Sequence, residues 1–211
     1  MSEEKVKNIS ETRPWFSIIF DSQSPEELKT KYDSWANTYD ADIRDDWSFM
    51  PVNIARTLSK LLPNKDATIL DAGAGTGLVG EALAQAGYTN LTAVDLSEKM
   101  LAIAEDKQVY QSLYQCNLEN SPIFSESVSF DAIIAAGVFT HAHAGVRALN
   151  NLFGLLKEEG LFFLTIREDY RSEMQTALDK LPWTLVSKED FHIYDEVKLM
   201  YLLAFKKERS Q

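Results

Sequence analysis

Three glycines at alternating positions follow an apolar run near residue 70, and a helical pattern begins directly after them. The stretch reads Ile69-Leu-Asp71-Ala-Gly73-Ala-Gly75-Thr-Gly77. Glycine adopts backbone angles that other residues cannot, and it lets a ligand approach the main chain closely. A strand, a glycine loop and a helix N-terminus in this order form a nucleotide-type binding site. Asp71 ahead of the glycines would repel a pyrophosphate and attract a ligand with an amino group and a positive centre.

From residue 67 onward, strand-like and helix-like segments alternate. Strands are predicted at 67–71, 91–95, 112–116, 130–136 and 161–166, with helices at 77–86, 97–107, 145–157 and 170–180. Two further strand-like runs, 183–193 and 196–206, are separated only by Tyr194 and Asp195. Two residues are too few for a parallel crossover, so these runs should form an antiparallel hairpin. We therefore expect a three-layer, Rossmann-like α/β fold whose mostly parallel seven-stranded sheet ends in an antiparallel hairpin.

Two helices are predicted ahead of this alternating region. Ser24–Glu27 combines an N-cap serine, a proline at the first helical position and a capping-box glutamate. The apolar face of this helix is expected to carry Leu28, Tyr32, Trp35 and Tyr39. The second helix begins near Pro51. We expect a single domain over residues 1–211, with a partly flexible segment at 1–23, cap helices at 24–62 and the Rossmann-like core at 67–206.

Charge and cysteine content restrict the partners and the compartment. The formal net charge is −11, and no cluster of Lys and Arg is evident. Phosphate contacts need a basic surface, so nucleic acid is not an expected partner. Cys116 is the only cysteine, which excludes an internal disulfide and fits a reducing compartment. No apolar run approaches a membrane span, and Met1–Lys5 has no signal-peptide core, so we expect a cytoplasmic protein without a membrane segment.

The residues that follow each strand are the candidates for a binding site, because ligands of open α/β sheets bind beyond the carboxyl ends of the strands. Asp95 follows the second strand, where an acid can accept both hydroxyls of a ribose. Asn117 and Leu118 follow the third, where an amide can bond the amino edge of adenine and a leucine can pack on its ring. The fourth is followed by Gly137 and, slightly later, by His141 and His143. Together these groups suit one adenosine-bearing ligand.

Each group also has a structural interpretation when taken alone. The glycines can be a tight turn, and Asp95 with Ser97 can serve as helix-capping chemistry. Met100 and the aromatic stripe of the first helix can be core, although the stripe can equally be a lid over a ligand. The conjunction of the groups at successive strand ends favours a single site.

In this combination the sequence resembles the class I S-adenosylmethionine-dependent methyltransferase family, whose sheet also ends in an antiparallel hairpin. The first motif of that family resembles Asp71–Gly77, and the resemblance continues over residues 30–206 through Asp95–Ser97, Phe130–Gly137 and Leu156–Gly160. Tyr32–Asp40 and Phe139–His141 are similar to segments of the methyltransferase-like proteins of the Williams–Beuren syndrome chromosome region.

The resemblance implies S-adenosyl-L-methionine as cofactor and S-adenosyl-L-homocysteine as product. The glycine loop would hold the methionine part, Asp95 the ribose, and Leu96 and Met100 the adenine faces. Asn117 stands where many relatives have aspartate, and both side chains offer an acceptor oxygen. The implied cofactor-binding residues are Tyr32, Tyr39, Asp71, Ala72, Gly73, Gly75, Gly77, Asp95, Leu96, Met100, Asn117, Leu118 and Gly137.

His141 and His143 are the candidate catalytic residues. Methyl transfer from a sulfonium is an in-line displacement, so the protein mainly aligns the reactants, and a general base helps only an acceptor that has to lose a proton. Histidine titrates near neutral pH, and residues two apart on an extended backbone share a side. Alternatively, His141 caps the next segment or shapes the pocket. Two histidines without an obvious third ligand do not predict a metal site.

The predicted function is methyl transfer to a small molecule, with a protein side chain as the second choice of acceptor. A non-catalytic S-adenosylmethionine-binding protein is the alternative outside enzymology. An NAD-dependent oxidoreductase is a remote alternative, because Gly75-Thr-Gly77-Leu-Val-Gly80 fits the dinucleotide fingerprint with Asp95 about 20 residues on. The sequence determines neither the acceptor atom nor the oligomeric state.

Overall fold

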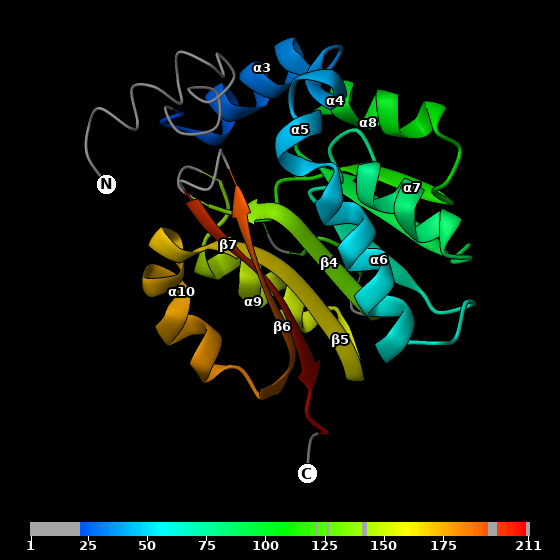
Figure 1. Ribbon diagram of the computed structural model, residues 1–211, viewed down its shortest axis with the longest axis vertical. Coiled ribbons are helices and arrows are strands. Elements are labelled where there is room, and N and C mark those ends of the chain that lie inside the picture. The colour runs from blue at the N-terminus through cyan, green and yellow to red at the C-terminus, as the bar shows by residue number, and fades with distance from the viewer. Residues whose placement is uncertain (1–21, 121, 126, 141–142, 194–197, 210–211) are drawn as a thin grey trace.

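A seven-stranded sheet with the order β3-β2-β1-β4-β5-β7-β6 forms the centre of the molecule (Figure 1). The computed structural model describes residues 22–120, 122–125, 127–140, 143–193 and 198–209. Its strands are β1 (Ile69–Ala72), β2 (Leu91–Asp95), β3 (Ser112–Gln115), β4 (Phe130–Phe139), β5 (Leu156–Arg167), β6 (Trp183–Ile193) and β7 (Lys198–Lys207). The first five strands pair in parallel, whereas β7 is antiparallel to both β5 and β6. The predicted fold class, including its closing hairpin, is confirmed.

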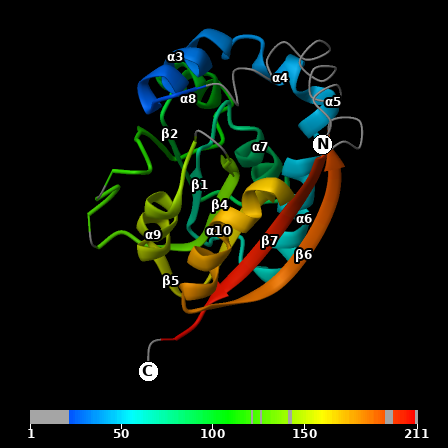
Figure 2. The same cartoon turned by 90° about the vertical axis from the view of Figure 1, so that its left-hand side faces the viewer.

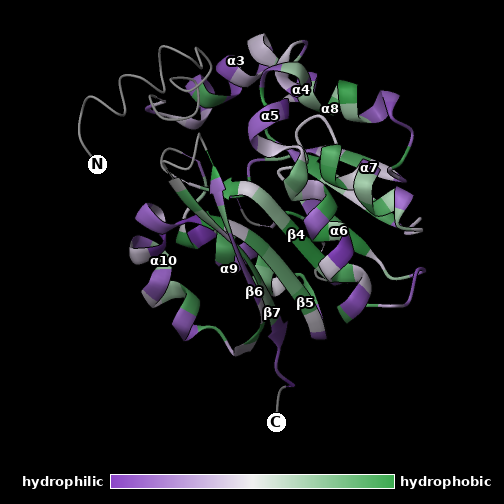
Figure 3. Cartoon of the chain, in the orientation of Figure 1, coloured by the Kyte–Doolittle hydropathy of each residue, from purple (hydrophilic) through white to green (hydrophobic). Residues whose placement is uncertain are grey.

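Helices cover both faces of this sheet, as the turned view makes plain (Figure 2). They are α3 (Pro25–Trp35), α4 (Tyr39–Asp42), α5 (Arg44–Trp47), α6 (Phe49–Leu61), α7 (Leu78–Gln85), α8 (Glu98–Asp106), α9 (Val146–Gly154) and α10 (Glu168–Lys180). One core cluster joins α9 and α10 to strand residues such as Leu70 and Ile133. A second joins α6 and α7 to their alternate neighbours, Ile69 and Ile134. The central strands are accordingly apolar on both faces, and the outer sides of the helices are mostly polar (Figure 3).

The short helices α3, α4 and α5, hereafter the cap, lie over the end of the sheet at which the parallel strands finish (Figure 1). The helix start at Ser24 is as predicted, since the Ser24 hydroxyl accepts a hydrogen bond from the Glu27 amide. The prediction that Tyr39 continues this helix is wrong. Asp42 Oδ2 accepts hydrogen bonds from Trp35 Nε1 and Thr38 Oγ1, both at 2.7 Å, and the chain turns there. Tyr39 therefore begins α4, yet its ring stays 4.6 Å from that of Trp35.

Strand β4 runs to Phe139, three residues beyond its predicted end at 136. Gly137 therefore lies within the strand and not after it. It has a φ of +74°, and the pairing with β5 shifts register between Ala135 and Phe139. The Gly137 amide donates to the Thr165 hydroxyl at 2.8 Å, which compensates for the lost ladder bond.

A second boundary differs from prediction at the start of β5. The preceding helix, α9, ends at Gly154 and not at 157, because Leu156 already pairs with Phe130 of β4. Residues 1–21, which include most of the segment expected to be flexible, lie outside the described residues, as do Tyr194 and Asp195. None of the helices in the described ranges is long and apolar enough to cross a membrane.

Candidate functional site

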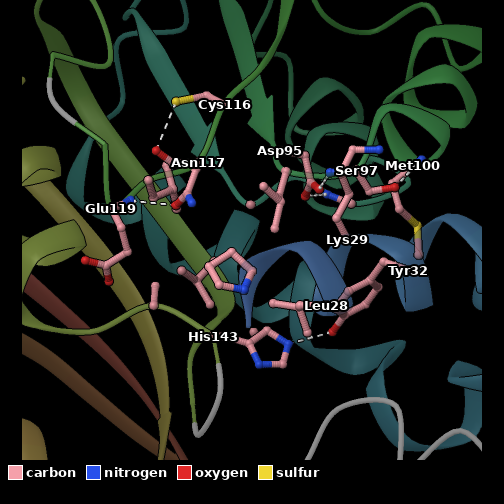
Figure 4. Close-up of a pocket in the computed structure, with 18 of the residues that line it drawn as sticks. Leu28, Lys29, Tyr32, Asp95, Ser97, Met100, Cys116, Asn117, Glu119 and His143 are labelled. Atoms are coloured by element: carbon pink, nitrogen blue, oxygen red, sulfur yellow. Dashed lines mark hydrogen bonds between the residues drawn. The ribbon is translucent and has the colours of Figure 1, made fainter. Parts of the chain in front are cut away.

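A pocket opens between the cap and the carboxyl ends of the central strands (Figure 4). Among the candidate residues, those that line it are Tyr32, Tyr39, Gly73, Gly75, Asp95, Leu96, Met100, Asn117, Leu118, Gly137 and His143. The structure thus brings together groups from four strand ends and from the cap. Asp71, Ala72 and Gly77 are not among the lining residues.

The glycine loop has the backbone that its sequence predicts. Gly73, Gly75 and Gly77 have φ values of +74°, +55° and +86°, which other residues rarely adopt. The amide of Gly73 donates to the Val94 carbonyl at 2.8 Å, tying the loop to β2. A Cβ at Gly73 would lie 2.4 Å from the Val138 side chain, whereas a Cβ at Gly75 would meet nothing within 4 Å. The main chain at Gly75 is therefore open to a ligand.

Asp71 lies behind the loop and not in the pocket wall. Asp71 belongs to β1, and its side chain points to the same side of the sheet as that of Ile69, which packs with α6 and α7. There its Oδ2 accepts a hydrogen bond from the Tyr110 hydroxyl at 2.6 Å, and the Gly80 amide donates to the same hydroxyl oxygen at 3.1 Å. Burial raises the pKa of Asp71 to about 7, despite the Tyr110 bond, and the Asp95 charge adds to the shift.

Asp95 joins the glycine loop to the start of α8. Its Oδ2 accepts from the Gly75 amide and its Oδ1 from the Ser97 amide, both at 2.8 Å. The Ser97 hydroxyl in turn caps α8 by accepting from the Met100 amide at 3.1 Å. Burial raises the pKa of Asp95 even though these backbone bonds act in the opposite direction. The carboxylate therefore does both things that the sequence suggested: it orders a helix start and it faces the pocket.

Asn117 and its neighbours form the wall of the pocket beyond β3. The Asn117 Oδ1 accepts from the Glu119 amide at 2.9 Å, which fixes the orientation of the Asn117 amide. Glu119 Oε1 accepts from the Gly145 amide at 2.7 Å and so holds the start of α9. Among the lining residues that the sequence did not single out as ligand contacts, four have polar side chains: Lys29, Ser97, Cys116 and Glu119. The last three follow within a few residues of the end of β2 or β3, so the strand-end rule would have found them, whereas Lys29 depends on the position of the cap.

Tyr32 and His143 face each other across the pocket. The Tyr32 hydroxyl lies 2.9 Å from His143 Nε2, and the two rings meet edge-to-face with centroids 5.6 Å apart (Figure 4). Both interpretations of the aromatic stripe hold in part, since Trp35 is buried in the core and Tyr32 lines the pocket. His141 lies outside the described residues. Among the residues that the structure describes, no group of three or more His, Cys, Asp or Glu side chains is placed to hold a metal ion.

Residues 70–164 match the family described as "Methyltransferase domain". The chain carries a class I S-adenosylmethionine-dependent methyltransferase domain. This methyltransferase domain is 33% identical over 157 residues to Methyltransferase-like protein 27 of Homo sapiens, covering 71% of this chain and 64% of the relative. It is 32% identical over 118 residues to a ubiquinone biosynthesis O-methyltransferase of Coxiella burnetii, covering 54% of this chain and 50% of the relative. The chain thus spans between half and two thirds of these curated relatives.

Solved structures share the fold of the methyltransferase domain at low sequence identity. Magnesium protoporphyrin IX methyltransferase from Synechocystis, with S-adenosylhomocysteine bound, superposes with a TM-score of 0.67 at 16% identity and covers 95% of this chain and 99% of its own. A 4+2 cyclase superposes with a TM-score of 0.72 at 13% identity, over 90% of this chain and 98% of its own. The methyltransferase family agrees with the sequence prediction.

Proposed function

We propose that this chain transfers the methyl group of S-adenosylmethionine to a small-molecule acceptor. The observation that carries the proposal is a pocket that polar strand-end residues line on one side and the Tyr32–His143 pair lines on the other. Gly75, Asp95 and Asn117 from neighbouring strand ends form one wall, and Tyr32 and His143 bond to each other across the opening.

The residues of the pocket fit the parts of the cofactor. The open main chain at Gly75 gives a flat ligand close access, and the Asp95 carboxylate beside it suits the ribose hydroxyls. Met100 and Leu118 offer apolar surface for the adenine faces. Gly137 is exposed with φ +74°, so no side chain of its own fills the space where the sulfonium end would lie.

The roles of Asp71, Ala72 and Gly77 in cofactor binding are indirect in this proposal. Asp71 supports the loop from behind through its hydrogen bond with Tyr110. Gly77 is required for the loop to enter α7, because a Cβ there would lie 3.1 Å from both Ala104 and Tyr110. Substitution of these residues should act through the shape of the loop.

The chemistry needs alignment and a proton acceptor more than a nucleophile. When bound, the cofactor supplies an electrophilic methyl group, and the protein orients the acceptor for in-line attack in a pocket that excludes water. His143 is the candidate base for an acceptor that has to lose a proton. Its Nε2 is engaged by Tyr32, so an acceptor hydroxyl that uses Nε2 has to replace Tyr32 there before it can pass its proton to the imidazole. His141 stays a second candidate from the sequence alone.

A small acceptor is favoured by the cover that α3 and α4 form. Pro25, Leu28 and Lys29 of α3 line the pocket together with Tyr39 of α4, so the cap covers one side of the space for the acceptor. The side chain of a folded protein would reach this space less easily. The relative from Coxiella burnetii is named as an O-methyltransferase of ubiquinone biosynthesis, which supports an oxygen acceptor on a small molecule. The acidic charge and single cysteine support a cytoplasmic location.

Titration calorimetry with S-adenosylmethionine, followed by a screen for labelled methyl transfer in a fractionated metabolite extract, tests the proposal. We expect binding, release of S-adenosylhomocysteine and label in a small-molecule fraction. Label in protein would indicate a protein acceptor, and binding of NADH without binding of S-adenosylmethionine would indicate an oxidoreductase.

A second function, cofactor binding without methyl transfer, is supported by one observation. The 4+2 cyclase described above shares this fold, and a fold alone does not fix the reaction. Tight cofactor binding with no methylated product in any fraction would favour that function.

A further inference from the structure

Two carboxylates of the cap bond buried hydroxyls on the loops that flank the pocket. Asp33 Oδ1 of α3 accepts from the Ser97 hydroxyl at 2.6 Å, across 64 positions of sequence. Asp40 Oδ1 of α4 accepts from the Thr76 hydroxyl at 2.5 Å, across 36 positions. Ser97 and Thr76 are each only 1% exposed. The cap is therefore attached on both sides of the pocket by the same kind of charge-assisted hydrogen bond.

Each carboxylate uses its second oxygen in the same way. Asp33 Oδ2 lies 2.6 Å from Lys29 Nζ, and Asp40 Oδ2 lies 3.2 Å from Lys107 Nζ. The lysines neutralise the carboxylates and hold them in the orientation in which Oδ1 meets the hydroxyl. Bonds of this kind are about twice as strong as bonds between neutral groups.

The hydroxyls belong to the two loops that we assign to the cofactor. Thr76 lies between Gly75 and Gly77, and the Ser97 amide donates to Asp95 Oδ1 at 2.8 Å. On the cap side, Asp33 directly follows Tyr32, and Asp40 directly follows Tyr39, and both tyrosines line the pocket. Each bond therefore joins a residue beside the candidate cofactor loop to a residue beside an aromatic cover.

We propose that Asp33 and Asp40 are positioning residues that latch the cap over the bound cofactor, so that breaking the two latches limits how fast the product leaves. This inference rests on the proposed function, because it assigns the pocket to the cofactor. Lifting α3 and α4 away from a bound ligand breaks the bonds to Ser97 and Thr76, so these bonds hold the cap in its closed position.

Release of S-adenosylhomocysteine from Asp33→Ala and Asp40→Ala, followed by stopped-flow fluorescence, tests the latches. A lost hydrogen bond to a charged group corresponds to release that is roughly tenfold faster or more. Asp40→Asn keeps an acceptor for the Thr76 hydroxyl and should retain most of the slow release. Asp45→Ala is the matched control, since Asp45 is an exposed cap carboxylate with no recorded hydrogen bond or ion pair in the described part of the chain.

A double-mutant cycle separates the latch from a general loss of stability. Thr76→Val removes the hydroxyl at nearly constant volume, so Asp40→Ala should speed release much less in the Thr76→Val background than in the wild type. Equal effects in the two backgrounds would overturn the Asp40 latch. If both aspartate variants melt at a lower temperature but release S-adenosylhomocysteine at the wild-type rate, Asp33 and Asp40 have only a structural role.

Hydrogen exchange without any ligand tests the latch independently of the proposed function. Amides of α3 and α4 should exchange faster in Asp33→Ala and Asp40→Ala than in wild type or Asp45→Ala. If the wild type does not bind S-adenosylhomocysteine, the proposed function and the gating role fail together, while faster exchange would still establish the contacts. Unchanged exchange together with unchanged release would overturn the inference and leave the proposed function standing.

Discussion

The Tyr32 hydroxyl lies 2.9 Å from His143 Nε2, although 111 positions of sequence separate the two residues. This bond connects α3 of the cap with the segment that follows β4, and both side chains line the pocket. An acceptor that uses Nε2 of His143 as a base has to displace Tyr32 from it. Closure of the cap and access to Nε2 are therefore linked through one hydrogen bond.

His143→Ala should lower turnover of an acceptor that has to lose a proton by about 10²–10⁴-fold, the usual contribution of a general base. Affinity for S-adenosylmethionine should change little, because the imidazole faces the acceptor side of the pocket in our proposal. Steady-state kinetics and calorimetry on the same preparation measure the two effects. Tyr32→Phe provides the comparison, since it keeps the ring and removes only the hydroxyl. Full activity of His143→Ala toward such an acceptor would remove His143 as the base.

Asp95→Ala should weaken binding of S-adenosylmethionine by roughly 1–3 kcal/mol, the scale of a lost hydrogen bond to a charged group. The carboxylate also receives the amides of Gly75 and Ser97, so the variant loosens the loop as well as the ribose contact. Titration calorimetry gives the affinity, and urea unfolding shows whether the fold is intact. Wild-type affinity in a folded variant would refute the ribose assignment.

The glycine loop and Asp95 were predictable because their roles depend on local backbone. Alternating positive φ values require glycine whatever the rest of the chain does. The position of Asp71 was not predicted, since its place directly before the glycines suggested a pocket residue. Asp71 still belongs to β1, and its side chain meets Tyr110.

The cap contacts were beyond prediction for a different reason. Tyr32 meets His143, and Asp40 meets Thr76, only because the cap docks on the sheet. Neither a helical period nor a strand-end rule encodes how two segments so far apart in sequence approach each other. The turn at Tyr39 was missed on the same grounds, as it depends on the two hydrogen bonds that Asp42 accepts.

Asp71 should make the free energy of unfolding fall as pH rises from about 4 to about 7. Burial raises its pKa from the ordinary 3.8 to about 7. In this window the folded protein holds a proton that the unfolded chain has released, so rising pH favours unfolding. A shift of roughly three units corresponds to about 4 kcal/mol at most. Asp71→Asn keeps an acceptor for Tyr110 and should remove the decline in the free energy of unfolding that Asp71 causes. Urea unfolding at several pH values measures this change.

Asp131→Asn is the matched control for that experiment. Although burial opposes it, hydrogen bonds from Lys157 and Thr68 lower the pKa of Asp131. The stability that Asp131 contributes is present above pH about 4 and is lost only as the pH falls through the lowered pKa. The Asp131→Asn substitution should lower the free energy of unfolding by the same amount at every pH between about 5 and 8. The slope of that free energy against pH should not change. An identical slope in wild type and Asp71→Asn would contradict the Asp71 assignment.

Gly80→Ala should destabilise the fold by about 1–3 kcal/mol, the usual cost of overpacking. A Cβ at Gly80 would lie 2.2 Å from the hydroxyl and ring of Tyr110, which is itself partly buried and bonded to Asp71. Tyr110 would have to move, and the carboxylate behind the glycine loop would lose its donor. Gly154→Ala is the control, because a Cβ there meets nothing within 4 Å and α9 should gain rather than lose stability. Urea unfolding of both variants should give opposite signs, and a Gly80→Ala protein as stable as wild type would mean that Tyr110 is free to shift without cost.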